Sequence, residues 1–119
     1  MTVTRMYPRL VVSDARAAID YYAKVFGAVP GESFSDEKGR IVHAEVSFGG
    51  AGVVGIKDQG DGDEPVSLIM ALEVTDPDEV AAAMEAGGAS VIYPIADHEY
   101  GRGGRLRDPW GIQWMLMRP

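Results

Sequence analysis

The chain has 119 residues, no cysteine and a formal net charge of −7, with 46% hydrophobic and 24% charged residues. This length and composition predict one globular domain, and the lack of cysteine excludes disulfides, thiol catalysis and cysteine-ligated metals. The acidic balance argues against nucleic acid as a partner, because nucleic-acid binding requires a basic face.

The N-terminal segment, MTVTRMYPRLVVSD, has no long apolar run and no small-residue cleavage site of the kind that ends a signal peptide. No stretch of the chain approaches roughly 18 consecutive apolar residues, the length of a membrane helix. We therefore expect a cytoplasmic protein with no membrane partner.

The first half of the chain predicts a strand, a helix and three further strands. The first strand covers residues 6–12, and Ser13 and Asp14 provide an N-cap for a helix that ends at Gly27. Three β-rich segments follow, PGESFSD, GRIVHAEVSFGG and GVVGIKD. Residues 59–65 are rich in glycine and acidic residues and are predicted to form a linker.

After the linker the same order restarts. Residues 66–74 predict a strand, and Thr75-Asp76-Pro77 starts a short helix with proline at its first position. Three more strands are expected in SVIYPIADHE, GGRLRDP and GIQWMLM. Residues 97–105 carry three glycines and mixed charge, so we expect a hairpin loop there, with a mobile lid as the alternative and His98 exposed.

The two halves also share sequence. LVVSD, ending at Asp14, matches LEVTD, ending at Asp76. Such a repeat indicates two copies of one supersecondary unit, because each half alone is too small to bury enough apolar surface. We expect a single domain over 1–119, with module one at 1–58, the linker at 59–65 and module two at 66–119.

The duplicated order, the segment VVSDARAAIDYYAKVFGA and the final RDPWGIQWML together resemble the vicinal oxygen chelate superfamily. That superfamily includes glyoxalase I, extradiol dioxygenases and the fosfomycin- and bleomycin-resistance proteins. GRIVHAEVSFGG and YGRGGRLRDPWGIQW resemble its PhnB-like, glyoxalase/bleomycin-resistance branch. The resemblance implies an α+β fold in which two tandem βαβββ modules form a curved mixed sheet around a concave pocket.

In the metal-dependent members, the first and last strands of each module supply the ligands. The resemblance places those positions at Tyr7, Gly55, Ile69 and Met115. Divalent metals of the Mg, Mn, Zn and Fe(II) kinds prefer imidazole nitrogen and carboxylate oxygen, which these residues lack. We predict no metal and no other cofactor, so glyoxalase I chemistry and extradiol cleavage are not expected.

Strand alternation predicts which side chains face the concave side, because successive side chains point to opposite faces. Tryptophan and tyrosine near the turns of the second half add candidate stacking surfaces. The predicted ligand-binding residues are Tyr7, Arg9, His43, Glu45, Glu73, Tyr100, Trp110, Gln113, Met115 and Met117.

Several of these residues have more than one interpretation. His43 and Glu45 form either a general base with its orienting partner, half of a relocated metal centre, or a simple contact on a solvated strand face. Arg9 and Glu73 pair either with ligand charges or with each other. Met115 and Met117 either shape a promiscuous pocket or fill core.

The sequence therefore favours a metal-independent binding protein that resembles the bleomycin-resistance proteins. Its ligand would be an antibiotic or similar bulky metabolite, cationic or flat and aromatic, sequestered in the pocket of a homodimer. The alternative is a glyoxalase-like enzyme of the lyase, isomerase or dioxygenase type, acting on a small carbonyl substrate with His43 and Glu45 as catalytic residues. A third hypothesis is a metalloenzyme with ligands relocated to His43, Glu45 and Glu73.

Overall fold

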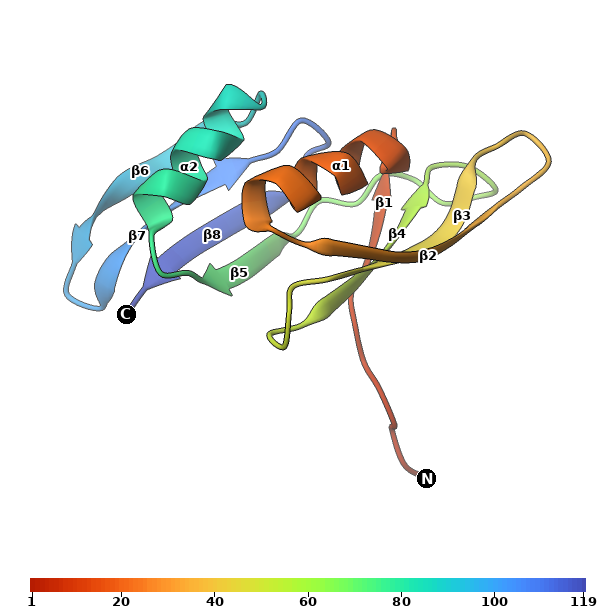
Figure 1. Cartoon of the computed structure of the whole chain (residues 1–119), viewed down its shortest axis with the longest axis horizontal. Helices are drawn as coiled ribbons and strands as arrows, with labels where there is room; N and C mark the ends of the chain where they lie inside the picture. The colour runs from red at the N-terminus through yellow and green to blue at the C-terminus, as the bar shows by residue number, and fades with distance from the viewer. The chain divides into compact units, whose positions relative to one another are not determined.

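The computed structural model describes all 119 residues as two compact units, Met1–Pro65 (unit one) and Val66–Pro119 (unit two). Each unit contains one helix and four strands in the order βαβββ (Figure 1), which confirms the predicted α+β class and its tandem modules. Unit one contains β1 (Arg9–Val12), α1 (Ala15–Phe26), β2 (Val29–Ser35), β3 (Ile41–Ser47) and β4 (Val53–Asp58). Unit two contains β5 (Ile69–Glu73), α2 (Pro77–Ala86), β6 (Ser90–His98), β7 (Gly101–Arg107) and β8 (Gln113–Arg118).

The strands lie in two four-stranded mixed sheets, ordered β1-β4-β3-β2 and β5-β8-β7-β6. In each sheet the first and last strands of the unit are parallel neighbours, and the remaining pairs are antiparallel. The sequence repeat therefore corresponds to a repeat of strand topology. Neither helix has the length and apolar character needed to span a bilayer.

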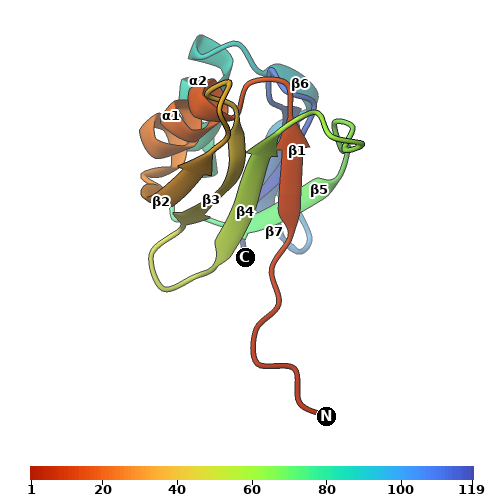
Figure 2. The same ribbon diagram turned by 90° about the vertical axis from the view of Figure 1, so that its right-hand side faces the viewer.

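Helix α1 begins and ends where its capping residues predict. The Asp14 carboxylate accepts a hydrogen bond from the backbone N–H of Ala17 at 3.1 Å, and Gly27 closes the helix with φ 67°. The helix covers one face of the sheet of unit one (Figure 2). The side chains buried between the helix and the sheet are Leu10, Val12, Ala18, Tyr22, Ala44, Val46 and Ile56.

Asp58, at the end of β4, joins this helix to the sheet. One of its carboxylate oxygens accepts from the backbone N–H of Ala15, and the other accepts from that of Ile41, both at 2.7 Å. One side chain therefore fixes the first turn of α1 against the start of β3.

Helix α2 follows the same plan in unit two. Asp76 caps it by accepting from the N–H of Glu79 at 3.1 Å, and Pro77 occupies its first turn, as predicted. The apolar face of the helix covers one face of the sheet (Figure 1), where Leu106, Trp114 and Leu116 are almost fully buried. Alternation along β8 therefore directs Met115 and Met117 to the opposite face.

The turn between β7 and β8 is built around the carboxylate of Asp108, which is only 3% exposed. Its Oδ1 accepts from the backbone N–H groups of Trp110 at 2.9 Å and Ile112 at 3.0 Å. Its Oδ2 accepts from the indole Nε1 of Trp114 at 2.9 Å. The DP-x-G turn that carries the family resemblance is thus also a buried polar anchor for the last strand.

The expectation of a loop over residues 97–105 is wrong. Strands β6 and β7 do form a hairpin, but only Glu99 and Tyr100 lie between them. Gly104 shows that glycine in this segment serves close packing of strands and does not mark a loop. A Cβ added there would lie 2.6 Å from the carbonyl oxygen of Tyr93 and 2.8 Å from that of Pro94, so glycine permits a close approach of two strands.

We expect Asp108→Asn to lower the free energy of unfolding by about 1–3 kcal/mol, because an amide group would turn a donor toward one of the three N–H groups and remove a charged acceptor. Urea unfolding followed by tryptophan fluorescence measures the change. The control is Glu99→Gln, an exposed carboxylate in the β6–β7 turn, for which we expect a change within about 0.5 kcal/mol. Equal unfolding midpoints for the two variants would contradict the role of Asp108.

Candidate functional site

In unit one, the sheet face away from α1 carries a polar cluster around Gly55. Arg9 and Glu45 are the register partners of Gly55 on the two neighbouring strands. A Cβ added at Gly55 would lie 3.1 Å from Cε2 of Tyr7 and 3.3 Å from Cε1 of His43. The rings of Tyr7 and His43 therefore occupy the space over β4 that a side chain at this position would need.

Glu45 is the centre of this cluster, and its main partner is Arg5. The guanidinium of Arg5 donates to both carboxylate oxygens of Glu45, at 2.8 and 3.0 Å, and lies 4.5 Å from the ring centroid of Tyr7. His43 Nε2 lies 3.5 Å from Oε2 of Glu45, at the limit of a hydrogen bond. The structure thus brings Tyr7, His43 and Glu45 together. Alternation along β3 accounts for His43 and Glu45, but β1 begins at Arg9 and not at residue 6 as expected, so Tyr7 precedes the strand.

Arg5 is a residue that the sequence analysis missed. It precedes β1, in a segment that extends beyond the end of the strand in Figure 2, so strand periodicity gives no information about its direction. Its hydrogen bonds hold the pKa of Glu45 at about 2. Glu45 is therefore an ionised group whose short hydrogen bonds go to Arg5, and its contact with His43, at 3.5 Å, is the longest of the three.

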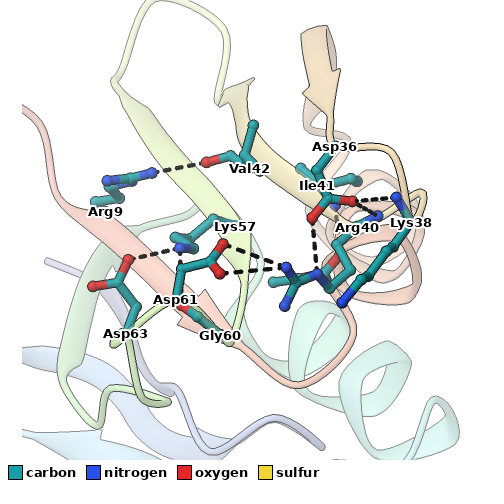
Figure 3. A network of polar contacts seen from close by, with 11 residues as sticks. Arg9, Asp36, Lys38, Arg40, Ile41, Val42, Lys57, Gly60, Asp61 and Asp63 are labelled. Carbon is teal, nitrogen blue, oxygen red and sulfur yellow. Dashed lines mark hydrogen bonds and ion pairs between the residues drawn. The ribbon is translucent and has the colours of Figure 1, made fainter.

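Arg9 is bound to the backbone and has no carboxylate partner within hydrogen-bond distance. Its Nη2 donates to the carbonyl oxygen of Val42 at 2.8 Å, across the intervening strand β4 (Figure 3). Nearby, the buried ammonium of Lys57 pairs with Asp63 at 2.6 Å, and Arg40 pairs with Asp36 at 2.9 Å. Figure 3 also shows the contact of Arg40 with Asp61, which together with the Lys57–Asp63 pair holds the segment after β4 against the sheet.

In unit two, the sheet face away from α2 carries a pocket of about 380 Å³, called here the unit-two pocket. Three of its residues, Tyr100, Met115 and Met117, were predicted from the sequence as ligand-binding residues. The full lining is Tyr93, Pro94, Ala96, His98, Tyr100, Gly104, Arg105, Met115 and Met117.

The walls of the unit-two pocket are aromatic rings and thioethers. The rings of His98 and Tyr100 are stacked, with centroids 5.0 Å apart and an interplanar angle of 5°. The rings of Tyr93 and Tyr100 are 59% and 65% exposed, so they are accessible for contact. Such a combination suits a flat apolar ligand, because aromatic and sulfur-containing side chains adapt to the face of a ring.

Arg105 is the second residue that the sequence analysis missed. It lies opposite Tyr93 and Met115 in the register of the sheet, and its Nη1 donates to Oε1 of Gln113 at 3.4 Å. The signal was available, since alternation along β7 places Leu106 under α2 and Arg105 on the pocket side.

The remaining predicted residues lie outside the lining of the unit-two pocket. Gln113 reaches it only through Arg105. Trp110 belongs to the β7–β8 turn, and its backbone N–H donates to Asp108. Glu73 is exposed on the edge strand β5, opposite Met117 of β8.

The donor chemistry does not fit a hard divalent metal. Of the four positions that the resemblance indicates, only Tyr7 carries an oxygen, and at Gly55 the rings of Tyr7 and His43 fill the space of a ligand side chain. No three or more His, Asp or Glu side chains gather closely enough to share an ion. The relocated set does not form either, since both oxygens of Glu45 are bound by Arg5.

We expect the Glu45 carboxylate to titrate near pH 2 in the folded protein, below its ordinary value of 4.5. Because folding lowers this pKa, the pairing stabilises the fold above the unfolded pKa, and that contribution is lost as the pH falls toward 2. Arg5→Met should raise the pKa of Glu45. It should also make the free energy of unfolding depend less steeply on pH in the acid range. Carboxyl NMR titration measures both forms, with Arg107→Met as a charge-matched control, and an unchanged Glu45 midpoint in Arg5→Met would refute the pairing.

Comparison with known proteins agrees with this architecture. An uncharacterized protein from Mycobacterium bovis is 34% identical over 123 residues, covering 94% of this chain and 81% of the relative. The structure of TioX from Micromonospora sp. ML1 matches over 98% of both chains, with a TM-score of 0.78 and 26% identity. A glyoxalase/bleomycin resistance protein from Streptomyces sp. CB03234 covers 92% of this chain and 96% of its own, with a TM-score of 0.70 and 25% identity.

The PhnB protein from Bacillus cereus shares the fold, with a TM-score of 0.77 at 18% identity over 98% of this chain and all of the other. The family model described as the Glyoxalase/Bleomycin resistance protein/Dioxygenase superfamily matches residues 4–116. With nearly the whole sequence matched and the tandem βαβββ modules in place, the chain belongs to the glyoxalase/bleomycin resistance protein/dioxygenase superfamily.

Proposed function

We propose that this protein binds a bulky, flat small molecule in the unit-two pocket and does so without a metal ion. The observation that carries the proposal is the pocket itself, about 380 Å³ in volume and walled by methionine and aromatic side chains with few polar groups. Small-molecule sites in proteins have this character, with volumes of roughly 300–1,000 Å³ and mostly apolar walls.

The shape of the ligand follows from the walls. The stacked rings of His98 and Tyr100 give the pocket a flat surface, and Met115 and Met117 add flexible thioethers to its lining. Methionine adapts to different ring shapes at small energetic cost, which favours a binder of related bulky compounds over a site for one small substrate.

The metal-independent part of the proposal is supported by the donor set at Tyr7, Gly55, Ile69 and Met115. The enzymatic alternative is less well supported, because His43 and Glu45, the catalytic pair that it requires, are not closely hydrogen-bonded to each other. Glu45 binds Arg5 through both oxygens and approaches His43 only at 3.5 Å. A general base needs an orienting partner within hydrogen-bond reach that is free to serve it.

We also propose that the protein acts as a homodimer, as the family resemblance implies. Tyr93 and Tyr100 leave large aromatic surfaces exposed at the pocket, and a second copy related by two-fold symmetry would cover part of them. Sedimentation equilibrium of the full chain should give twice the mass of 12.8 kDa. A monomer at all accessible concentrations would refute this part alone.

We expect flat aromatic antibiotics to raise the melting temperature of the protein, because a ligand that binds only the folded state stabilises it. The shift should also be seen when a metal chelator is present. A scanning-fluorimetry panel of flat aromatic and cationic antibiotics, including a bleomycin, identifies binders, and calorimetry gives their Kd. Tyr100→Ala should weaken binding by about 2- to 10-fold through loss of a stacked ring.

The matched control is Phe34→Ala, which removes an aromatic side chain of similar exposure, 57% against 65%, from unit one. This variant should bind as the wild type does. If no compound shifts the melting temperature, but a small carbonyl compound such as methylglyoxal is consumed and His43→Ala stops its consumption, the binding proposal is wrong and the enzymatic alternative is correct.

A further inference from the structure

We propose that Arg105 is the receptor for an acidic oxygen group, such as an aryl carboxylate, on the flat ligand of the unit-two pocket. The inference rests on the proposed function, since it specifies the chemistry of the ligand in that same pocket. It differs from the sequence-based expectation, which allowed a cationic ligand on the basis of the net negative charge.

The first argument is that Arg105 lacks the acidic partner that the other two half-buried arginines, Arg40 and Arg102, have, whereas the remaining arginines without an ion pair are exposed. Arg5 and Arg102 each hold a carboxylate with two hydrogen bonds of 2.7 to 3.0 Å, and Arg40 holds one at 2.9 Å. Arg105 makes no ion pair, and its single hydrogen bond is the 3.4 Å contact to the neutral amide of Gln113. A chain with 18 acidic residues thus leaves this half-buried cation without a carboxylate.

The second argument is the Nε atom of Arg105. It is buried and has no hydrogen-bond partner. Nearly all buried N–H groups in folded proteins are satisfied, because leaving one unpaired loses the hydration of the group without compensation. Because Arg105 lines the pocket, it would gain a hydrogen bond by turning this unpaired donor toward an acceptor on the ligand.

The third argument is the orientation of the guanidinium. Its Cζ lies 5.4 Å from the centroid of the Tyr93 ring, and its backbone is opposite Met115, so the group sits between the aromatic and the thioether walls. A planar guanidinium presents parallel N–H donors that match the two oxygens of a carboxylate. A flat acid would place its ring against Met115 and Met117 and its carboxylate on Arg105.

The same geometry disfavours a cation at this position. A ligand ammonium in the pocket would stand next to Arg105 with no acidic side chain among the lining residues to offset the repulsion. The net charge of the protein is thus negative, whereas the charged side chain in the pocket lining, Arg105, is positive. Selectivity for an acid would come from short-range contact with Arg105, because the net charge of −7 does not attract anions at long range.

Three probes that share one ring system test the proposal: 2-naphthoate, 2-naphthamide and 2-naphthylmethylammonium. At neutral pH we expect the wild type to bind naphthoate about 10-fold or more tightly than naphthamide, and the ammonium probe most weakly, since a charge-assisted bond is stronger than a neutral one. Calorimetry on the full chain gives the three dissociation constants.

Arg105→Met keeps the apolar stem and removes the guanidinium. It should abolish the preference for naphthoate and leave the affinity for naphthamide within about twofold, because ring contacts are retained. Arg107→Met makes the same charge change two residues along β7, outside the pocket lining, and should keep the preference. Should Arg105→Met fail to fold by circular dichroism, Arg105→Lys replaces it and should retain only part of the preference.

Two results overturn the role of Arg105 while leaving the proposed function intact. One is similar affinity of the wild type for all three probes, or a preference for the ammonium. The other is an undiminished naphthoate preference in Arg105→Met. If the wild type binds none of the three probes and no antibiotic of the panel, the proposed function is refuted, and this inference with it.

Discussion

The buried carboxylate of Asp108 is the constraint on which unit two depends. Its three hydrogen bonds define the turn and seat the indole of Trp114 beneath α2. Once Trp114 is fixed inward, strand alternation leaves Met115 and Met117 no direction except the pocket side. The antiparallel register with β7 then places Arg105 opposite Met115. Unit one uses a related device, since Asp58 ties α1 to β3 through two backbone N–H groups. In both units an acidic side chain next to the last strand organises the elements around it.

Two modules of the same topology carry different chemistry on corresponding faces. In unit one the carboxylate of Glu45 is paired with Arg5 and lies beside His43. In unit two the pocket is mostly apolar, and the one arginine in its lining, Arg105, has no carboxylate partner. Each of these arginines lies beside a tyrosine ring, at 4.5 Å in unit one and 5.4 Å in unit two, so the difference is the missing acid. We therefore propose unit two as the binding site, because the Arg5–Glu45 pair of unit one already satisfies both of its charges.

Membership in this superfamily establishes the architecture but not the chemistry, because the same fold supports metalloenzymes and binding proteins. The residues at the indicated metal positions distinguish these possibilities. At Gly55 a ligand side chain is absent, and the rings of Tyr7 and His43 occupy its space. On β8, Met115 contributes a thioether to an apolar wall. In the proposed function these groups contribute binding energy through contact with a bulky ligand, since hydrophobic burial and ring stacking need no metal.

The sequence predicted the elements and the faces of their side chains from local patterns alone. Asp14 and Gly27 delimit α1, and the alternation in β8 assigns Met115 and Met117 correctly, because caps and side-chain periodicity are local properties of the chain. It failed at residues 97–105, where composition indicated a loop but close strand packing requires the glycines. The partners of the arginines, by contrast, could not be read from local patterns. Arg5 meets Glu45 40 positions away along the sequence, and Arg105 meets no acid at all. Both facts depend on which distant residues the fold brings together, and no local pattern encodes that.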